Sequence, residues 1–104
     1  MEQPGLVERI WQVVAAIPPG HVMSYGQVAR QAGYPNHARF VGRVLRMLPE
    51  DSQLPWFRVI TAQGRLAFAP DTDAWWRQRT LLEAEGVPFI NDRIPARYQV
   101  RQLL

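Results

Sequence analysis

The 104-residue chain has no cysteine and no lysine, and it contains only two histidines. Without cysteine it can form neither a disulfide bond nor a thiolate metal site, and it has no cysteine nucleophile. His21 and His37 are too few for a metal cluster without carboxylates placed beside them. The sequence also lacks a glycine-rich phosphate loop. We therefore expect no metal, no cofactor and no chemistry that depends on a thiol.

Long apolar runs are absent as well. No stretch approaches the roughly 20 apolar residues that a membrane-spanning helix needs. The first residues, MEQPGLVERIW, are acidic and polar, unlike a signal peptide. We expect a cytoplasmic, nucleoid-associated protein that does not enter a membrane.

The length predicts a single domain, residues 1–104, because a chain of this size can bury one core but not two. A content of 47% hydrophobic and 20% charged residues is typical of a globular protein. The pattern shows no long exposed apolar face, so we expect a monomer.

Positive charge is supplied by arginine alone. All twelve basic residues are arginines, and the net charge is +3. This balance favours polyanionic partners, and arginine makes paired hydrogen bonds to phosphate and to guanine. Codon usage in a GC-rich genome is the alternative explanation for the missing lysine, and the sequence leaves both open.

Two helices are indicated in the first third of the chain. Apolar residues recur at helical spacing from Leu6 to Ile17, and the sequence Pro-Pro-Gly at 18–20 stops this helix. Ser24 followed by Gln27 is a capping box, which predicts that a short second helix begins at Tyr25. Gly33 suits the left-handed residue after its end.

A third helix is predicted over residues 37–48, with Pro49 after its end. Its apolar face repeats at i, i+3, i+4 and i+7, and the opposite face carries Arg39, Arg43 and Arg46. A short helix, a tight turn and a helix with a basic outer face make a helix-turn-helix pattern. The stripe suits a groove of DNA, although a solvated surface is the alternative. It carries no asparagine or glutamine, which argues against reading of base sequence.

The second half predicts a small β wing and a fourth helix. The segment WFRVIT reads as a strand, which AQGR can turn and LAF can return as a hairpin. A helix follows in DTDAWWRQRTLLEAEG and ends at Gly86. Residues 87–90 and 98–103 are further candidate strands. The predicted fold class is therefore mainly α with a small β wing, similar to a winged helix-turn-helix.

Three residues carry both a packing and a functional interpretation. Tyr25 is either an aromatic packed at a helix N-terminus or a phenol aimed at a backbone phosphate. Trp56 is either core or the wall of a pocket on which a base stacks. Glu85 lies on the apolar side of the last helix, where a half-buried carboxylate needs an ion pair or a capping contact.

Four segments, IPPGHVMSYGQVA, ARFVG, PWFRVI and LLEAEG, come in the order and spacing of the C-terminal domain of O6-alkylguanine-DNA alkyltransferases. The resemblance covers residues 6–87. The active strand of those enzymes reads Pro-Cys-His-Arg-Val, whereas this chain reads Pro-Trp-Phe-Arg-Val at 55–59. A tryptophan at the cysteine position is typical of alkyltransferase-like proteins, and the chain resembles these proteins.

The resemblance implies a protein that binds the minor groove of DNA and flips an O6-alkylated guanine into a pocket. Tyr25 matches the tyrosine that crowds the phosphate of the flipped nucleotide, and Arg39 matches the arginine that replaces the extruded base in the stack. Trp56 matches the residue beside the alkyl group. Glu85 matches the glutamate that ends the enzymes' proton relay. The residues predicted to bind the DNA or the lesion are Tyr25, Arg39, Arg43, Arg46, Trp56 and Arg58.

Three parts of the enzymes' catalytic machinery are missing. Alkyl transfer needs a thiolate, and Trp56 has no atom that would attack an O-alkyl carbon. Phe57 replaces the histidine of the relay and cannot accept a proton. Leu48 stands where the enzymes usually have asparagine.

The leading hypothesis is a non-enzymatic sensor of O6-alkylguanine in double-stranded DNA, which presents the lesion to nucleotide-excision repair proteins. A sequence-reading winged-helix transcription factor is the alternative, supported by the generic helix-turn-helix pattern. A third hypothesis is an active alkyltransferase with another nucleophile, although no residue is placed for that role.

Overall fold

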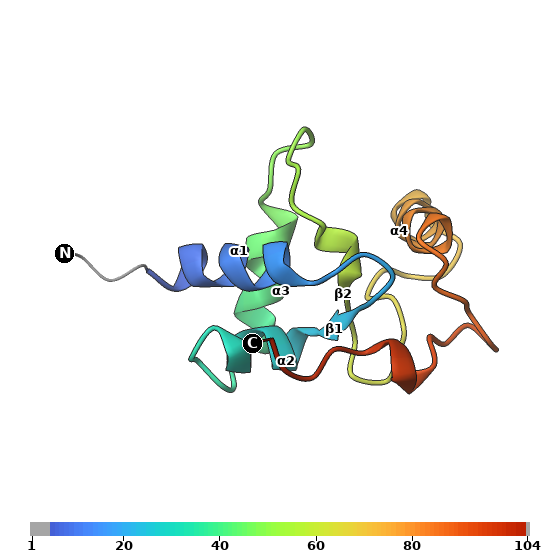
Figure 1. The fold of residues 1–104 in the computed structure, drawn as a ribbon. Coiled ribbons are helices and arrows are strands. Elements are labelled where there is room, and N and C mark those ends of the chain that lie inside the picture. Colours follow the sequence, from blue (N-terminus) through green and yellow to red (C-terminus); the bar gives the residue numbers. More distant parts are fainter. Residues whose placement is uncertain (1–4, 104) are drawn as a thin grey trace.

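The structure is a computed structural model that describes residues 5–103. Residues 1–4, which belong to the segment compared with signal peptides, lie outside this range. Helices α1 (Leu6–Ala16), α2 (Tyr25–Gln31) and α3 (Ala38–Arg46) form one group, and α4 (Asp73–Ala84) lies on the other side of a two-stranded sheet (Figure 1). No helix among the described residues is both long enough and apolar enough to cross a membrane.

The first two helices form as the sequence predicts. Helix α1 buries Ile10 and Val14 and ends before the Pro-Pro-Gly turn. The Ser24 hydroxyl accepts a hydrogen bond from the backbone N–H of Gln27 at 3.1 Å, which is one half of the predicted capping box. The Gln27 side chain does not return to Ser24 but donates to the carbonyl of Arg101. Gly33 has a φ of 90°, as expected after a helix end.

Helix α3 packs against α2 after a turn at residues 32–37, so the predicted helix-turn-helix is present. Val41 and Val44 are buried on its inner face. Its last residue, Arg46, precedes the predicted end by two residues.

The small sheet is built differently from the predicted wing. A 3-10 helix, η1 (Trp56–Arg58), replaces the first half of the expected strand, and only β2 (Val59–Ile60) is extended. Strand β2 pairs in parallel with β1 (Met23–Ser24), so the hairpin prediction was wrong. Thr61 and Arg65 do share a turn hydrogen bond of 2.9 Å, but residues 66–68 add no strand.

The sheet lies between two hydrophobic clusters, because neighbouring residues on a strand point to opposite faces. Met23 and its register partner Val59 belong to the cluster formed with α1, α2 and α3. Val22 and Ile60 belong to the cluster formed with α4. The short sheet therefore joins the helix-turn-helix to α4. The 3-10 helix η1 immediately precedes β2 in the chain.

Helix α4 begins as predicted, because the Thr72 hydroxyl accepts a hydrogen bond from the N–H of Trp75 at 3.3 Å. The tail has no named strand among residues 87–103, only single bridges and a 3-10 helix, η2 (Ala96–Tyr98). The expected strands were wrong there. The tail instead runs back to α2 (Figure 1), and Val100 donates to the Val22 carbonyl at 2.7 Å.

Candidate nucleic-acid interface

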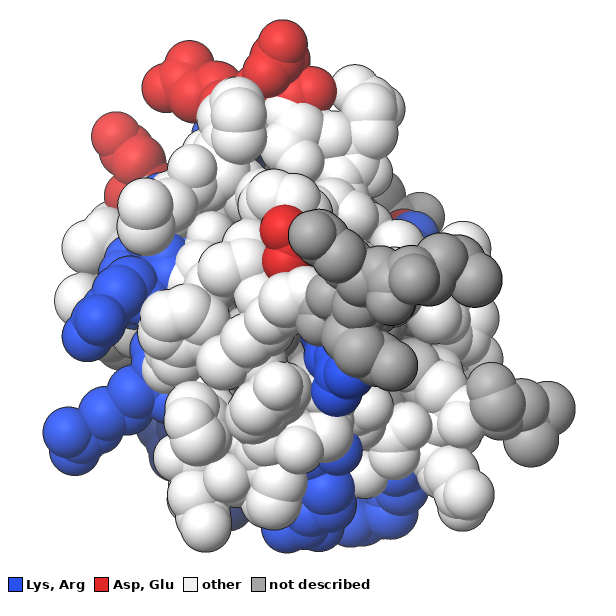
Figure 2. Space-filling model, turned by 90° about the vertical axis from the view of Figure 1, so that its left-hand side faces the viewer, with Lys and Arg blue, Asp and Glu red and all other residues white. Residues whose placement is uncertain are grey.

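The outer face of α3 presents the predicted arginine stripe. Arg39, Arg43 and Arg46 are all exposed. They line a shallow cavity of about 400 Å³ together with the half-buried Tyr25 and with Ala38, Gly42, Thr61 and Ala67. On the face drawn in Figure 2, arginines gather along the lower and left edges and carboxylates mainly along the upper edge. Because Tyr25 is the first residue of α2 and lines the same cavity, the stripe forms a basic surface next to the N-terminus of α2.

Tyr25 is placed at this surface by its position as the first residue of α2. Burial raises the pKa of its phenol above the ordinary value, and the charge of Arg46 partly opposes that shift. The phenol therefore stays protonated at neutral pH and can donate a hydrogen bond to a phosphate oxygen.

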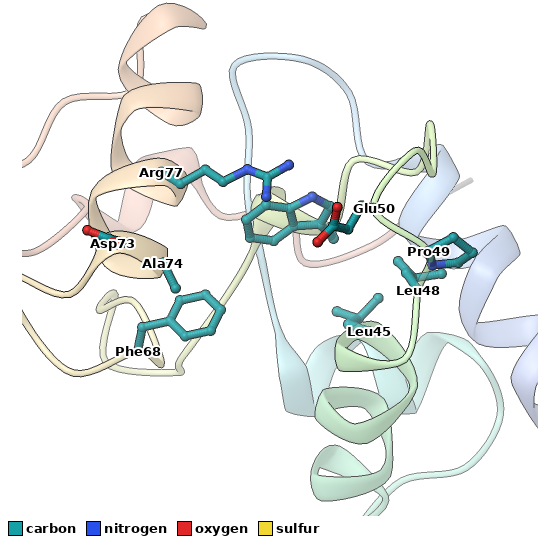
Figure 3. A pocket seen from close by; sticks show the side chains of 9 residues that line it. Leu45, Leu48, Pro49, Glu50, Phe68, Asp73, Ala74 and Arg77 are labelled. Atoms are coloured by element: carbon teal, nitrogen blue, oxygen red, sulfur yellow. The ribbon is translucent and has the colours of Figure 1, made fainter.

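A second cavity, of about 350 Å³, has Trp56 as one wall (Figure 3). The Phe68 ring meets the Trp56 ring edge-on, with ring centroids 6.4 Å apart. The remaining lining is apolar at Leu45, Leu48, Pro49 and Ala74, and charged at Glu50, Asp73 and Arg77. This volume falls in the range of small-molecule sites, and an aromatic wall with an apolar lining suits a flat base with an alkyl group.

The two cavities are neighbours. On α3, Arg46 lines the arginine cavity and Leu45 lines the Trp56 cavity. In the following loop, Ala67 and Phe68 are divided between the two cavities in the same way. The Trp56 pocket therefore opens beside the basic surface.

Arg58 lies apart from the other predicted DNA-binding residues. Its guanidinium donates to Glu85 through Nε at 3.0 Å and through Nη2, and its Nη1 donates to the carbonyl of Ile17 at 2.9 Å. The side chain is only 12% exposed. The expectation that Arg58 contacts DNA has no support in this placement, because its donors are used inside the protein.

Glu85 forms an ion pair with Arg58, which is one of the two kinds of contact expected for it from the sequence. It also accepts a hydrogen bond from the N–H of Gly20 at 3.1 Å. The hydrogen bond from Arg58 lowers the pKa of Glu85 below its usual value, against the effect of burial. Arg58 belongs to η1, and Gly20 belongs to the turn after α1. By binding both residues, the Glu85 carboxylate connects these two segments to the end of α4.

Sequence reasoning missed Gln78, which is 1% exposed. Its amide Nε2 donates to the carbonyls of Phe57 and Val59 at 3.0 Å each, so α4 holds the backbone on both sides of Arg58. Its Oε1 is buried without a hydrogen-bond partner in the described structure. A signal was present, since Gln78 lies three residues after Trp75 and four before Leu82, as a polar residue on the apolar face of the helix.

The family model described as the 6-O-methylguanine DNA methyltransferase DNA-binding domain matches residues 6–87. The chain belongs to this family. The resemblance predicted from the sequence is therefore confirmed, and so is the mainly helical fold class. Within the family, this chain has no cysteine, so it lacks a thiol nucleophile.

Relatives in the family include proteins that are not named as enzymes. The DNA base-flipping protein of Escherichia coli K12 is 53% identical over 81 residues, which cover 77% of this chain and 60% of that protein. Alkyltransferase-like protein 1 of Schizosaccharomyces pombe is 37% identical over 79 residues, which cover 76% of this chain and 73% of that protein. The match to the E. coli protein thus spans less than two thirds of its length.

The fold is similar to that of S. pombe Atl1, solved in complex with damaged DNA containing O6-carboxymethylguanine. The TM-score is 0.85 at 29% sequence identity, and the alignment covers 98% of this chain and 100% of the Atl1 chain.

Proposed function

We propose that this protein is a non-enzymatic sensor of O6-alkylguanine in double-stranded DNA. It binds the minor groove through the α3 side, flips the modified base into the Trp56 pocket and marks the site for nucleotide-excision repair proteins. The observation that carries the proposal is an aromatic-walled cavity that opens beside the arginines of α3.

Each step of the proposed cycle has a residue that suits it. The arginines of α3 neutralise phosphates, which supplies affinity that does not depend on sequence. Extrusion of a base costs a few kcal/mol, and Arg39 offsets part of this cost by filling the gap in the stack. Trp56 and the apolar lining then hold the alkyl group by contact.

No alkyl transfer follows in this proposal. The indole of Trp56 offers no nucleophile to the alkyl carbon, and Arg58 occupies the carboxylate of Glu85. The lesion therefore remains intact, which is what a protein that hands the site to other repair proteins requires.

The experiment is a binding titration with two duplexes of one sequence, carrying O6-methylguanine or guanine at the same position, at fixed salt. We expect tighter binding to the methylated duplex. Equal affinity would leave a general DNA-binding protein and refute the sensor. Co-purification with nucleotide-excision repair proteins on lesion-bearing DNA then tests the downstream step, and sedimentation tests the expected monomer.

A further inference from the structure

Arg77 stands at the Trp56 pocket, and in the part of the chain that the structure describes it forms no ion pair. It projects from α4, and its Cζ atom lies 5.8 Å from the centroid of the Trp56 ring. Within residues 5–103, no ion pair or hydrogen bond engages its guanidinium. Arg79, two residues later on the same helix, pairs with Glu83 and Asp92. Arg77 is thus a cation held near the pocket by an aromatic ring and free to bind an anion.

The charged lining of the pocket is of mixed sign. Glu50 and Asp73 line it beside Arg77, while the rest of the lining is apolar. In Figure 3, Arg77 reaches from α4 towards the middle of the pocket, Glu50 enters from the opposite side, and Asp73 stays at the edge. A substituent that enters this pocket therefore meets both an apolar lining and charged groups of either sign.

We propose that Arg77 determines specificity by the charge of the O6 substituent, binding the carboxylate of carboxyalkyl lesions while Glu50 opposes it. This inference rests on the proposed function. A planar guanidinium can donate two parallel hydrogen bonds to a carboxylate. In a partly enclosed pocket the attraction between opposite charges is also stronger than in water. Neutral substituents use the apolar lining and do not depend on Arg77.

The test compares two substituents of nearly equal shape, O6-carboxymethylguanine and its neutral amide, O6-carbamoylmethylguanine, in otherwise identical duplexes. The ratio of the two dissociation constants isolates the effect of the charge. We expect Arg77→Gln to shift this ratio against the carboxylate by about fivefold, the upper range for an exposed ion pair. Glu50→Gln should shift the ratio in favour of the carboxylate. Arg77→Lys should retain part of the preference, because lysine keeps the positive charge but cannot donate the two parallel hydrogen bonds of a guanidinium.

Arg93→Gln is the matched control. Arg93 is exposed, lines neither cavity, and its removal lowers the net charge by the same amount. This substitution should weaken binding to both duplexes by the same factor and leave the ratio of the two dissociation constants unchanged. The inference is overturned if Arg77→Gln leaves the ratio of dissociation constants unchanged, or if Arg93→Gln shifts that ratio as much as Arg77→Gln does. Failure of the proposed function is distinguishable, because the wild-type protein would then not prefer O6-methylguanine over guanine.

Discussion

Arg39 is exposed near the start of α3, so its side chain can act on DNA without supporting the core. We expect Arg39→Ala to weaken binding to an alkylated duplex by about tenfold, because in the proposed function the Arg39 side chain fills the gap left by the flipped base. The free energy of unfolding should change by no more than about 0.5 kcal/mol, as for most surface substitutions. Titration and thermal melting of the same sample measure both. A large fall in melting temperature would instead make Arg39 structural.

Substitution of Trp56 should reduce recognition of the lesion without reducing the general affinity for DNA. Trp56→Ala removes the aromatic wall, so we expect affinity for an O6-methylguanine duplex to fall towards that for plain duplex. Affinity for plain duplex should stay, because the arginines of α3 are untouched. Competition between the two duplexes measures the preference. If the variant kept the wild-type preference, Trp56 would be a packing residue only.

The ion pair of Glu85 predicts how the stability of the protein depends on pH. Its folded pKa is lowered, so its ion pair with Arg58 stabilises the protein above the unfolded glutamate pKa of about 4.3. That contribution is lost as pH falls through the lower, folded pKa. We expect Glu85→Gln to be less stable at pH 7 by about 2 kcal/mol and to lose less stability on acidification.

Urea unfolding of wild type and Glu85→Gln at several pH values tests this. The matched control is Glu83→Gln, because Glu83 lies two residues before Glu85, in the last turn of α4, but is half exposed and pairs with Arg79 at the surface. The idea fails if the wild type and Glu85→Gln change in parallel below pH 4.3.

At the scale of elements, the helices were predictable and the strands were not. Each helix carries its own signals, such as Ser24 at the start of α2 and Gly86 after α4. The segment WFRVIT carries an apolar run whose local pattern fits a strand. Its conformation is decided elsewhere, because Gln78 binds the backbone at Phe57 and Val59 from another helix. Such long-range contacts are not encoded in the spacing of one segment.

The turn after β2 was predicted correctly although its hairpin was not, and it depends on Gly64. This residue has a φ of 83°, and a Cβ there would lie 2.7 Å from the carbonyl oxygen of Ile94. Its own carbonyl accepts a hydrogen bond from the N–H of Ile94 at 2.8 Å. We expect Gly64→Ala to lower the free energy of unfolding by about 1–3 kcal/mol, through backbone strain and the clash.

Denaturant unfolding measures that loss, and Gly26→Ala is its control. Gly26 lies within α2, and a Cβ there would meet nothing within 4 Å. Alanine should therefore be neutral or stabilising at position 26. Equal effects at the two positions would show that the turn is not constrained as described.

At the scale of the whole molecule, the sequence predicted the two halves of the site but not their junction. The arginine stripe follows from helical spacing, and Trp56 was singled out through the resemblance to alkyltransferase-like proteins. That Phe68, Ala74 and Arg77 complete the pocket could not be predicted, because they come from a loop and a helix brought in by the second core cluster. The site therefore combines a locally encoded surface with a pocket made by tertiary packing.

This division predicts that two properties of binding can be changed independently. In the proposed function, the α3 surface supplies affinity through phosphates, and the Trp56 pocket supplies preference for the lesion. We expect the double variant Arg43→Ala/Arg46→Ala to bind alkylated and plain duplexes more weakly by the same factor. The slope of log affinity against log salt should become shallower by about 1 to 2, since each lost phosphate contact removes roughly 0.9.

Titrations at several salt concentrations with both duplexes check the slope and the preference together. The preference for the alkylated duplex should be the same at every salt concentration, because the neutral methyl group in the pocket releases no counterions. If the double variant instead lost its preference while keeping its salt slope, the arginines would be reading the flipped base. The basic surface and the pocket would then form one recognition unit, and the assignment of affinity to α3 and preference to Trp56 would be wrong.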